Sequence, residues 1–78
     1  MAKRSDLATL LQRIGSVTSD DLERAARERG WELHRVRGSH HIYRKAGWPG
    51  RISIPRGTKA IGTIRGIIHE LAEEETHD

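Results

Sequence analysis

The chain has 78 residues, a length that suits one domain with a small hydrophobic core. It contains no cysteine, which excludes disulfide bonds, a thiolate nucleophile and the cysteine frameworks of most zinc sites. No apolar run approaches the roughly 20 residues of a membrane span, and the start of the chain lacks the pattern of a signal peptide. We therefore expect a cytoplasmic protein that does not enter a membrane.

The formal net charge of +3 conceals an uneven distribution of charge along the chain. Residues 29–59 carry eight basic side chains and one acidic side chain, whereas residues 60–78 carry one basic and five acidic side chains. A basic middle predicts one surface for a polyanion such as a nucleic acid. The alternative is a soluble domain whose basic residues are scattered over its surface.

Two helices are expected before residue 30. Ser5 to Ile14 carries apolar residues at helical spacing, with Ser5 at the N-cap position. A second helix is expected from Thr18 or Ser19 to about Arg29, followed by Gly30, which suits the left-handed conformation that ends many helices. The apolar face of this second helix is thin and consists of Leu22, Ala25 and Ala26.

The pattern then changes to that of β-strands, which are expected at residues 31–37, 40–46 and 51–56. Gly38-Ser39 predicts a tight hairpin turn between the first two strands, and the turn-rich segment 47–50 separates the second from the third. In the first strand the alternation of Trp31 and Leu33 is broken at Val36, which predicts a β-bulge near Arg35.

A last helix is expected from about Thr63 to Glu73, after a connecting loop at residues 56–62. We expect residues 74–78 to form a disordered acidic tail. The element order α-α-β-β-β-α predicts an α+β fold, in which helices cover one face of a three-stranded antiparallel sheet. The other face of the sheet would be open to solvent.

Most of the basic side chains fall on or around this predicted sheet. They are Arg35, Arg37, Arg44, Lys45, Arg51, Arg56 and Lys59. A sheet that is covered by helices on one side and basic on the other can bind a phosphate backbone. Charged residues also commonly do no more than solvate the open face of an antiparallel sheet. Because one sign of charge dominates so strongly, we favour the polyanion interpretation.

Two adjacent histidines follow the predicted hairpin turn, in the segment Gly-Ser-His-His-Ile-Tyr at residues 38–43. Because side chains alternate across a strand, His40 and His41 should point to opposite faces, which argues against one metal ion bound by both. A metal site that includes His34 or His69 is an alternative, as is an ordinary role in a strand. We expect neither a metal nor a cofactor.

The alternation also bears on which histidine faces solvent. If Ile42 faces the core together with Ile52 and Ile54, His40 lies on the core side and His41 on the open side. The alternation need not hold at the first residue of a strand, so both histidines are retained.

A histidine on a basic sheet suits phosphodiester chemistry. Histidine is the side chain best able to move protons near neutral pH, and Gly38 lets a substrate backbone approach closely. Such a ring could deprotonate an RNA 2′-hydroxyl, which then attacks the adjacent phosphorus. Neighbouring arginine or lysine side chains would stabilise the charge on the phosphoryl oxygens.

Four segments occur in an order and at a spacing that together are specific. They are Gly-Trp at 30–31, Gly-Ser-His-His-Ile-Tyr-Arg at 38–44, Ile-Ser-Ile-Pro-Arg at 52–56 and Ile-Gly-Thr-Ile-Arg-Gly-Ile-Ile at 61–68. From about Ser19 to Leu71 the chain thereby resembles the HicA (YcfA-like) toxins. The resemblance implies a fold similar to a double-stranded-RNA-binding domain over residues 18–73. It also implies a bacterial or archaeal mRNA interferase, an endoribonuclease that acts without a metal.

The resemblance further implies roles and partners. The catalytic histidine of the family maps to His40 in the commonest form of the motif and to His41 in members with Gly-Ser-Asn-His; we favour His40 and retain both. The RNA-binding candidates are Arg37, Gly38, Ser39, Arg44, Arg51, Arg56 and Lys59. The implied partners are single-stranded RNA or mRNA as substrate and a HicB-type antitoxin that covers the active surface. DNA would be contacted only through the antitoxin.

Residues 1–17 depart from the short family pattern and are predicted to form an additional helix. It could pack on the domain, extend the antitoxin interface or mediate oligomers, and its leucine-rich face favours burial. The rival to the enzyme is a non-catalytic RNA-binding or protein-interaction module of the same fold. The intact Gly-Ser-His-His segment favours the enzyme.

Overall fold

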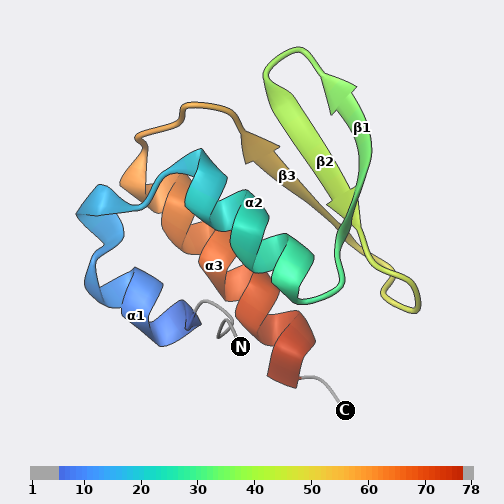
Figure 1. Ribbon diagram of the computed structural model, residues 1–78, viewed down its shortest axis with the longest axis horizontal. Coiled ribbons are helices and arrows are strands. Elements are labelled where there is room, and N and C mark those ends of the chain that lie inside the picture. The colour runs from blue at the N-terminus through green and yellow to red at the C-terminus, as the bar shows by residue number, and fades with distance from the viewer. Residues whose placement is uncertain (1–5, 77–78) are drawn as a thin grey trace.

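The computed structural model describes residues 6–76, which form helices around a small sheet (Figure 1). In chain order the elements are α1 (Leu7–Gln12), the 3₁₀ turn η1 (Ile14–Ser16), α2 (Ser19–Glu28), β1 (Glu32–Arg37), β2 (His40–Arg44), β3 (Arg51–Pro55) and α3 (Ile61–Thr76). This order confirms the predicted α+β fold. Within residues 6–76, no helix is long and apolar enough to cross a membrane.

The first two helices begin at side chains that accept hydrogen bonds from the backbone. Ser5, the expected N-cap of the first helix, lies outside the described residues; Asp6 caps α1 and accepts from the N–H of Ala8 at 3.0 Å. Thr18 and Asp21 form a reciprocal capping box at α2. The N–H of Thr18, which donates to Asp21, holds the pKa of that carboxyl below its ordinary value.

The last helix is longer than predicted at both ends, and residues 74–76 are helical instead of disordered. The last turn is tied to the rest of the fold by two ion pairs. Lys45 Nζ lies 2.7 Å from Glu74 Oε2, and Arg29 Nε lies 3.1 Å from Glu75 Oε2. These contacts explain why an acidic segment continues the helix. Residues 77–78 of the expected tail lie outside the described residues.

The three strands form an antiparallel sheet in the order β1-β2-β3. The β1–β2 register shifts between Leu33 and Arg35, which leaves His34 as the extra residue and confirms the predicted bulge. Gly38 in the hairpin turn has a φ of +57°, which glycine adopts without strain.

The register of β2 against β3 decides which side chains face the helices. Tyr43 lies opposite Ile52 and His41 opposite Ile54, while Ile42 lies opposite Ser53 on the other face. The conditional prediction that placed Ile42 on the core side is therefore wrong. The fully buried Tyr43 ring faces the core instead, because its hydroxyl can donate a hydrogen bond to the buried Glu23 carboxylate of α2.

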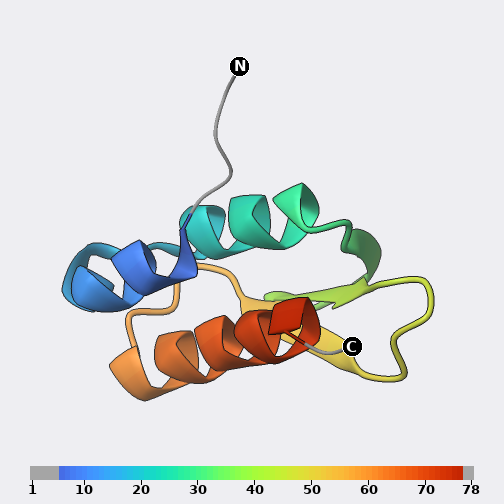
Figure 2. The same cartoon turned by 90° about the horizontal axis from the view of Figure 1, so that it is seen from below.

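The helices and the inner face of β3 share one core. α2 and α3 run side by side and both contact β3, while α1 packs against α3 (Figure 2). The core side chains are Leu7, Leu10, Val17, Leu22, Ala25, Ala26, Trp31, Tyr43, Ile52, Ile54, Ile64, Ile67, Ile68 and Leu71. Every residue of β1 is exposed, so this edge strand extends beyond the helical cover (Figure 1).

Candidate functional site: two faces around His40 and His41

The open face of the sheet carries His40 and four arginines. The antiparallel register places Arg37 beside His40 at one end of β2, Arg35 beside Ile42, and Arg44 beside Arg51 at the other end. With about 3.3 Å of rise per residue, the two ends of β2 lie about 13 Å apart. An extended polyanion can therefore contact both ends at once.

The end of this face away from His40 carries Arg44 and Arg51, with Glu32 of β1 opposite Arg44. Loss of solvation, together with the charges of Arg51, Arg44 and Arg35, holds the pKa of His34 below its ordinary value. His34 is thus surrounded by like charge, as expected of a surface that attracts phosphates.

His40 lies on this face with an exposed side chain. Its Nδ1 lies 3.1 Å from the hydroxyl oxygen of Ser53, the diagonal neighbour on β3. A hydroxyl both donates and accepts hydrogen bonds, so this contact is compatible with either tautomer of the ring.

His41 points the other way, towards α2, and meets a buried carboxylate. Its Nδ1 lies 2.9 Å from Oε1 of Glu23, which is only 4 % exposed. The same oxygen accepts a hydrogen bond from the hydroxyl of Tyr43, and Oε2 accepts one from Arg56. Three donors, two from β2 and one from the residue that follows β3, therefore converge on one carboxylate.

Arg56 links this carboxylate to the hairpin turn. Its guanidinium group also lies 2.6 Å from Asp20, and its backbone N–H donates to the carbonyl of Ser39 at 2.7 Å. The pKa of Arg56 is raised by its hydrogen bonds to Asp20 and Glu23. Arg56 therefore lies beside His41 and away from the open face that carries Arg37.

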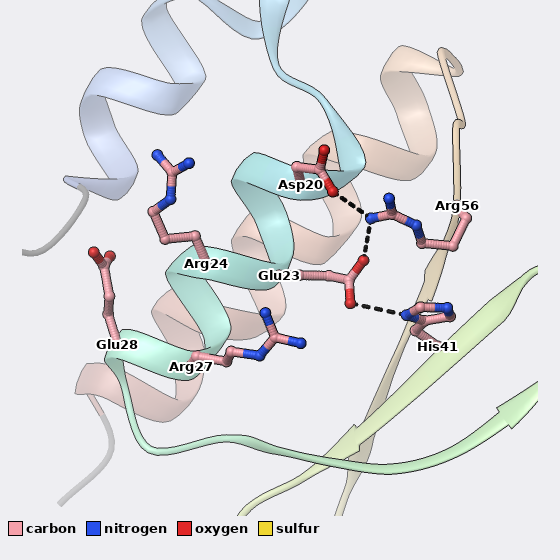
Figure 3. Close-up of a pocket in the computed structure, with 7 residues that line it drawn as sticks. All are labelled: Asp20, Glu23, Arg24, Arg27, Glu28, His41 and Arg56. Atoms are coloured by element: carbon pink, nitrogen blue, oxygen red, sulfur yellow. Dashed lines mark hydrogen bonds and ion pairs between the residues drawn. The ribbon is translucent and has the colours of Figure 1, made fainter.

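These groups line an open cleft of about 520 Å³ between α2 and the sheet (Figure 3). Figure 3 shows Glu23 between Arg56 and His41, with the two interactions drawn as dashed lines. The guanidinium carbon of Arg27 lies 5.7 Å from the centre of the Tyr43 ring. The lining residues are Asp20, Glu23, Arg24, Arg27, Glu28, His41 and Arg56.

The hydrogen bonds in the cleft decide the charge of its buried groups. Burial opposes ionisation of Glu23, but the hydrogen bonds from Tyr43, His41 and Arg56 outweigh it and lower the pKa of that carboxyl. Burial, and then the hydrogen bond to Glu23, raise the pKa of the Tyr43 hydroxyl to about 12. Glu23 is thus ionised and Tyr43 is neutral at neutral pH.

The structure separates the residues that the sequence grouped together. Arg37, Arg44 and Arg51 share the open face with His40, whereas His41 and Arg56 lie in the cleft. Gly38 and Ser39 form the turn between β1 and β2. Lys59 lies in the β3–α3 loop, beside a different hollow that η1 also lines.

Sequence reasoning did not identify Glu23 as a candidate site residue. A signal was present, because Ser19, Leu22, Glu23 and Ala26 follow the i, i+3, i+4, i+7 pattern of one helical face. An acid on the buried stripe of a helix needs a polar partner. The partners come from β2 and the loop after β3, so their identity depends on tertiary structure.

Comparison with known protein families gave a match. The family model described as the HicA toxin of bacterial toxin–antitoxin matches residues 19–72, well over half of the chain. The matched range confirms the resemblance seen from Ser19 to Leu71 and contains both faces of the site. No match was found among curated proteins.

Proposed function

Because the chain belongs to the HicA toxin family and is the toxin component of a toxin–antitoxin system, we propose that it is a metal-independent endoribonuclease acting on mRNA. The observation that carries the proposal is the placement of the histidine pair. At the start of β2 one ring lies on each face of the sheet, and each face carries arginines. Either ring can therefore reach a phosphodiester that arginines hold.

The open face supports binding of single-stranded RNA. Its arginines are exposed and distributed over the length of β2, which suits successive phosphates of an extended strand. Ile42, half-buried in the middle of the same face, adds an apolar surface on which a base can lie.

The proposed reaction is an internal transesterification. A histidine nitrogen takes the proton of a ribose 2′-hydroxyl, and the 2′-oxygen forms a bond to the adjacent phosphorus. The bond from phosphorus to the 5′-oxygen breaks, and that oxygen takes up a proton from solvent. The products are a 2′,3′-cyclic phosphate and a 5′-hydroxyl, with arginines stabilising the negative phosphoryl oxygens.

In the part of the chain that the structure describes, no group of three or more His, Cys, Asp or Glu side chains is arranged to hold a metal ion. Glu23, the carboxylate beside a histidine, already has three hydrogen-bond donors.

The antitoxin partner of this toxin is proposed to be HicB-like and to cover the arginine-bearing open face.

Residues 1–17 are proposed to be an addition to the family domain of residues 18–73. α1 buries Leu7 and Leu10 and packs against α3.

Cleavage of RNA in the presence of EDTA tests this function. The parent protein should cleave single-stranded RNA and leave a cyclic phosphate, while the double variant H40A/H41A should lose about 10²–10⁴-fold in rate. The matched control is H69A, which removes an exposed histidine of α3. A double variant that cleaves as fast as the parent would refute the catalytic role of the pair.

The rival function is a binding module without catalysis. It predicts that the parent and the double variant bind RNA equally and that neither cleaves it. In both cases binding should weaken steeply with salt, so only the cleavage assay separates the two functions.

A further inference from the structure

We propose that Glu23 is a positioning residue that holds His41 in the tautomer with the proton on Nδ1, so that Nε2 is the atom that accepts the substrate proton. This inference rests on the proposed ribonuclease function and deepens it. It names the ring, the reacting atom and a second residue that the histidine motif does not contain.

The hydrogen bond between His41 and Glu23 can have only one direction. Glu23 is ionised, because its pKa is lowered, and an ionised carboxylate can only accept. The Nδ1 atom of His41, at 2.9 Å from Oε1, must therefore carry a proton. In the neutral ring the lone pair is then on Nε2, on the side of the imidazole away from Glu23.

The Glu23 carboxylate is itself held in place by several contacts. It is 4 % exposed, and it accepts hydrogen bonds from Tyr43 and Arg56 as well as from His41. A group with three separate donors cannot rotate without breaking several contacts. The ring it orients keeps a side-chain exposure of 25 %, which leaves it accessible from the cleft.

The buried Tyr43 hydroxyl alone does not account for a carboxylate at position 23, because a neutral acceptor would satisfy it as well. Position 23 shares the buried stripe of α2 with Leu22 and Ala26, where an apolar side chain would pack without loss of solvation. Buried ionic groups often stabilise a fold no better than apolar residues of similar size. The carboxylate therefore has a functional role, and orientation of an acid–base histidine is the best-known use of such a contact.

His40 has no equivalent arrangement. Its partner is the hydroxyl of Ser53, which fits either tautomer, and the contact is exposed. Arginines lie near both rings, so positive charge alone does not distinguish a catalytic ring from a non-catalytic one. Only His41 combines a fixed tautomer with a cleft that contains Arg27 and Arg56.

The tautomer can be measured without RNA. In protein labelled with ¹⁵N, the chemical shifts of the two ring nitrogens of His41 should identify the Nδ1–H form at neutral pH, and His40 should show a mixture. E23Q should lose the pure Nδ1–H form, because the amide that replaces the carboxylate can both donate and accept. A His41 ring in the Nε2–H form in the parent protein would overturn the proposal, whatever the fate of the variant.

The catalytic consequence is tested on the same proteins. E23Q should lower cleavage at saturating RNA at least tenfold, with the RNA affinity unchanged, because the carboxylate acts through the ring and not on the RNA. The matched control is E70Q, the same change on α3 outside the lining of the cleft, which should cleave like the parent. Circular dichroism establishes that both variants are folded.

The outcomes separate this inference from the proposed function. A parent protein that cleaves no RNA refutes the function, and this result is seen before any Glu23 variant is used. A parent that cleaves RNA, together with E23Q at the parental rate, refutes the inference alone. Loss of cleavage in E23Q that is matched by an equal loss in E70Q also refutes it.

Discussion

The two faces of the sheet at the start of β2 differ in how firmly they hold a histidine. On the open face, His40 is exposed, contacts one hydroxyl and lies among arginines. On the helical face, His41 contacts a buried carboxylate that two further donors hold. Adjacent residues of one strand thus lie in two different environments, an exposed face that carries arginines and a cleft that contains a buried carboxylate. We therefore propose that the open face attracts the polyanion by its charge, whereas proton transfer depends on the ring that is held in one tautomer.

The largest expected effect comes from removing each ring separately. H41A should lower the rate of RNA cleavage about 10²–10⁴-fold, whereas H40A should lower it less than about tenfold and mainly weaken RNA binding. Single-turnover cleavage and fluorescence anisotropy measure the two quantities. A larger loss of cleavage in H40A than in H41A would place the chemistry on the open face and contradict the roles proposed for the two histidines.

The buried side should also lose more stability when a contact is deleted. Y43F removes a hydroxyl that donates to an ionised carboxylate, which is worth about 1.5–3 kcal/mol. Urea unfolding measures the loss. In the E23Q background the same change should cost clearly less, because the charged acceptor is gone. Equal losses in both backgrounds would show that the Tyr43–Glu23 contact contributes little.

The dependence of stability on pH below neutrality tests the contacts of Glu23 in another way. The fold lowers the pKa of Glu23, so its carboxylate stabilises the protein above the ordinary value of 4.5, and this contribution is lost as pH falls through the lowered pKa. The difference in Tm between the parent and E23Q should therefore be largest at neutral pH and should become smaller in acid.

The matched comparison is E70Q, where the sign is opposite. Burial, and then the charge of Glu73, raise the pKa of Glu70, so its ionisation destabilises the fold at neutral pH. E70Q should have a Tm slightly above that of the parent at neutral pH, and the gain should vanish in acid. A gap between the parent and E23Q that does not change with pH would contradict the network described for Glu23.

The smallest expected effect concerns the open face alone. R44A/R51A removes two exposed arginines, so the slope of log K against log salt for single-stranded RNA should fall by about 1.4. R65A, on an exposed position of α3, is the matched control and should leave the slope unchanged. An unchanged slope in R44A/R51A would mean that RNA does not lie across the far end of the sheet.

Local pattern was enough to predict most of the fold. The spacing of Ile64, Ile67, Ile68 and Leu71 placed the last helix, and the broken alternation at Val36 predicted the bulge in β1. The ends of elements were less predictable. α3 continues to Thr76 because Glu74 and Glu75 form ion pairs with Lys45 and Arg29, which follow β2 and α2. No local sequence pattern predicts these contacts.

The candidate site was predictable only in part. Its motif placed His40 and His41 on opposite faces, since alternation along a strand is a local property. The condition that Ile42 faces the core was wrong, because Ile42 and Tyr43 are both plausible core residues until the register with β3 is known. Glu23 was missed because its partners lie 18, 20 and 33 residues further along the chain.

The amino-acid sequence by itself determined the element order, the basic middle of the chain, the paired histidines and the family. Each of these depends on residue type and on short spacing. Only the tertiary structure shows that His41 contacts a carboxylate and that Arg56 lies away from the open face. It also shows that Tyr43 is both a core residue and a hydrogen-bond donor. Those features depend on how α2 packs against β2 and β3. Packing brings distant residues into contact, and only contact sets the tautomer, charge and orientation on which acid–base chemistry relies.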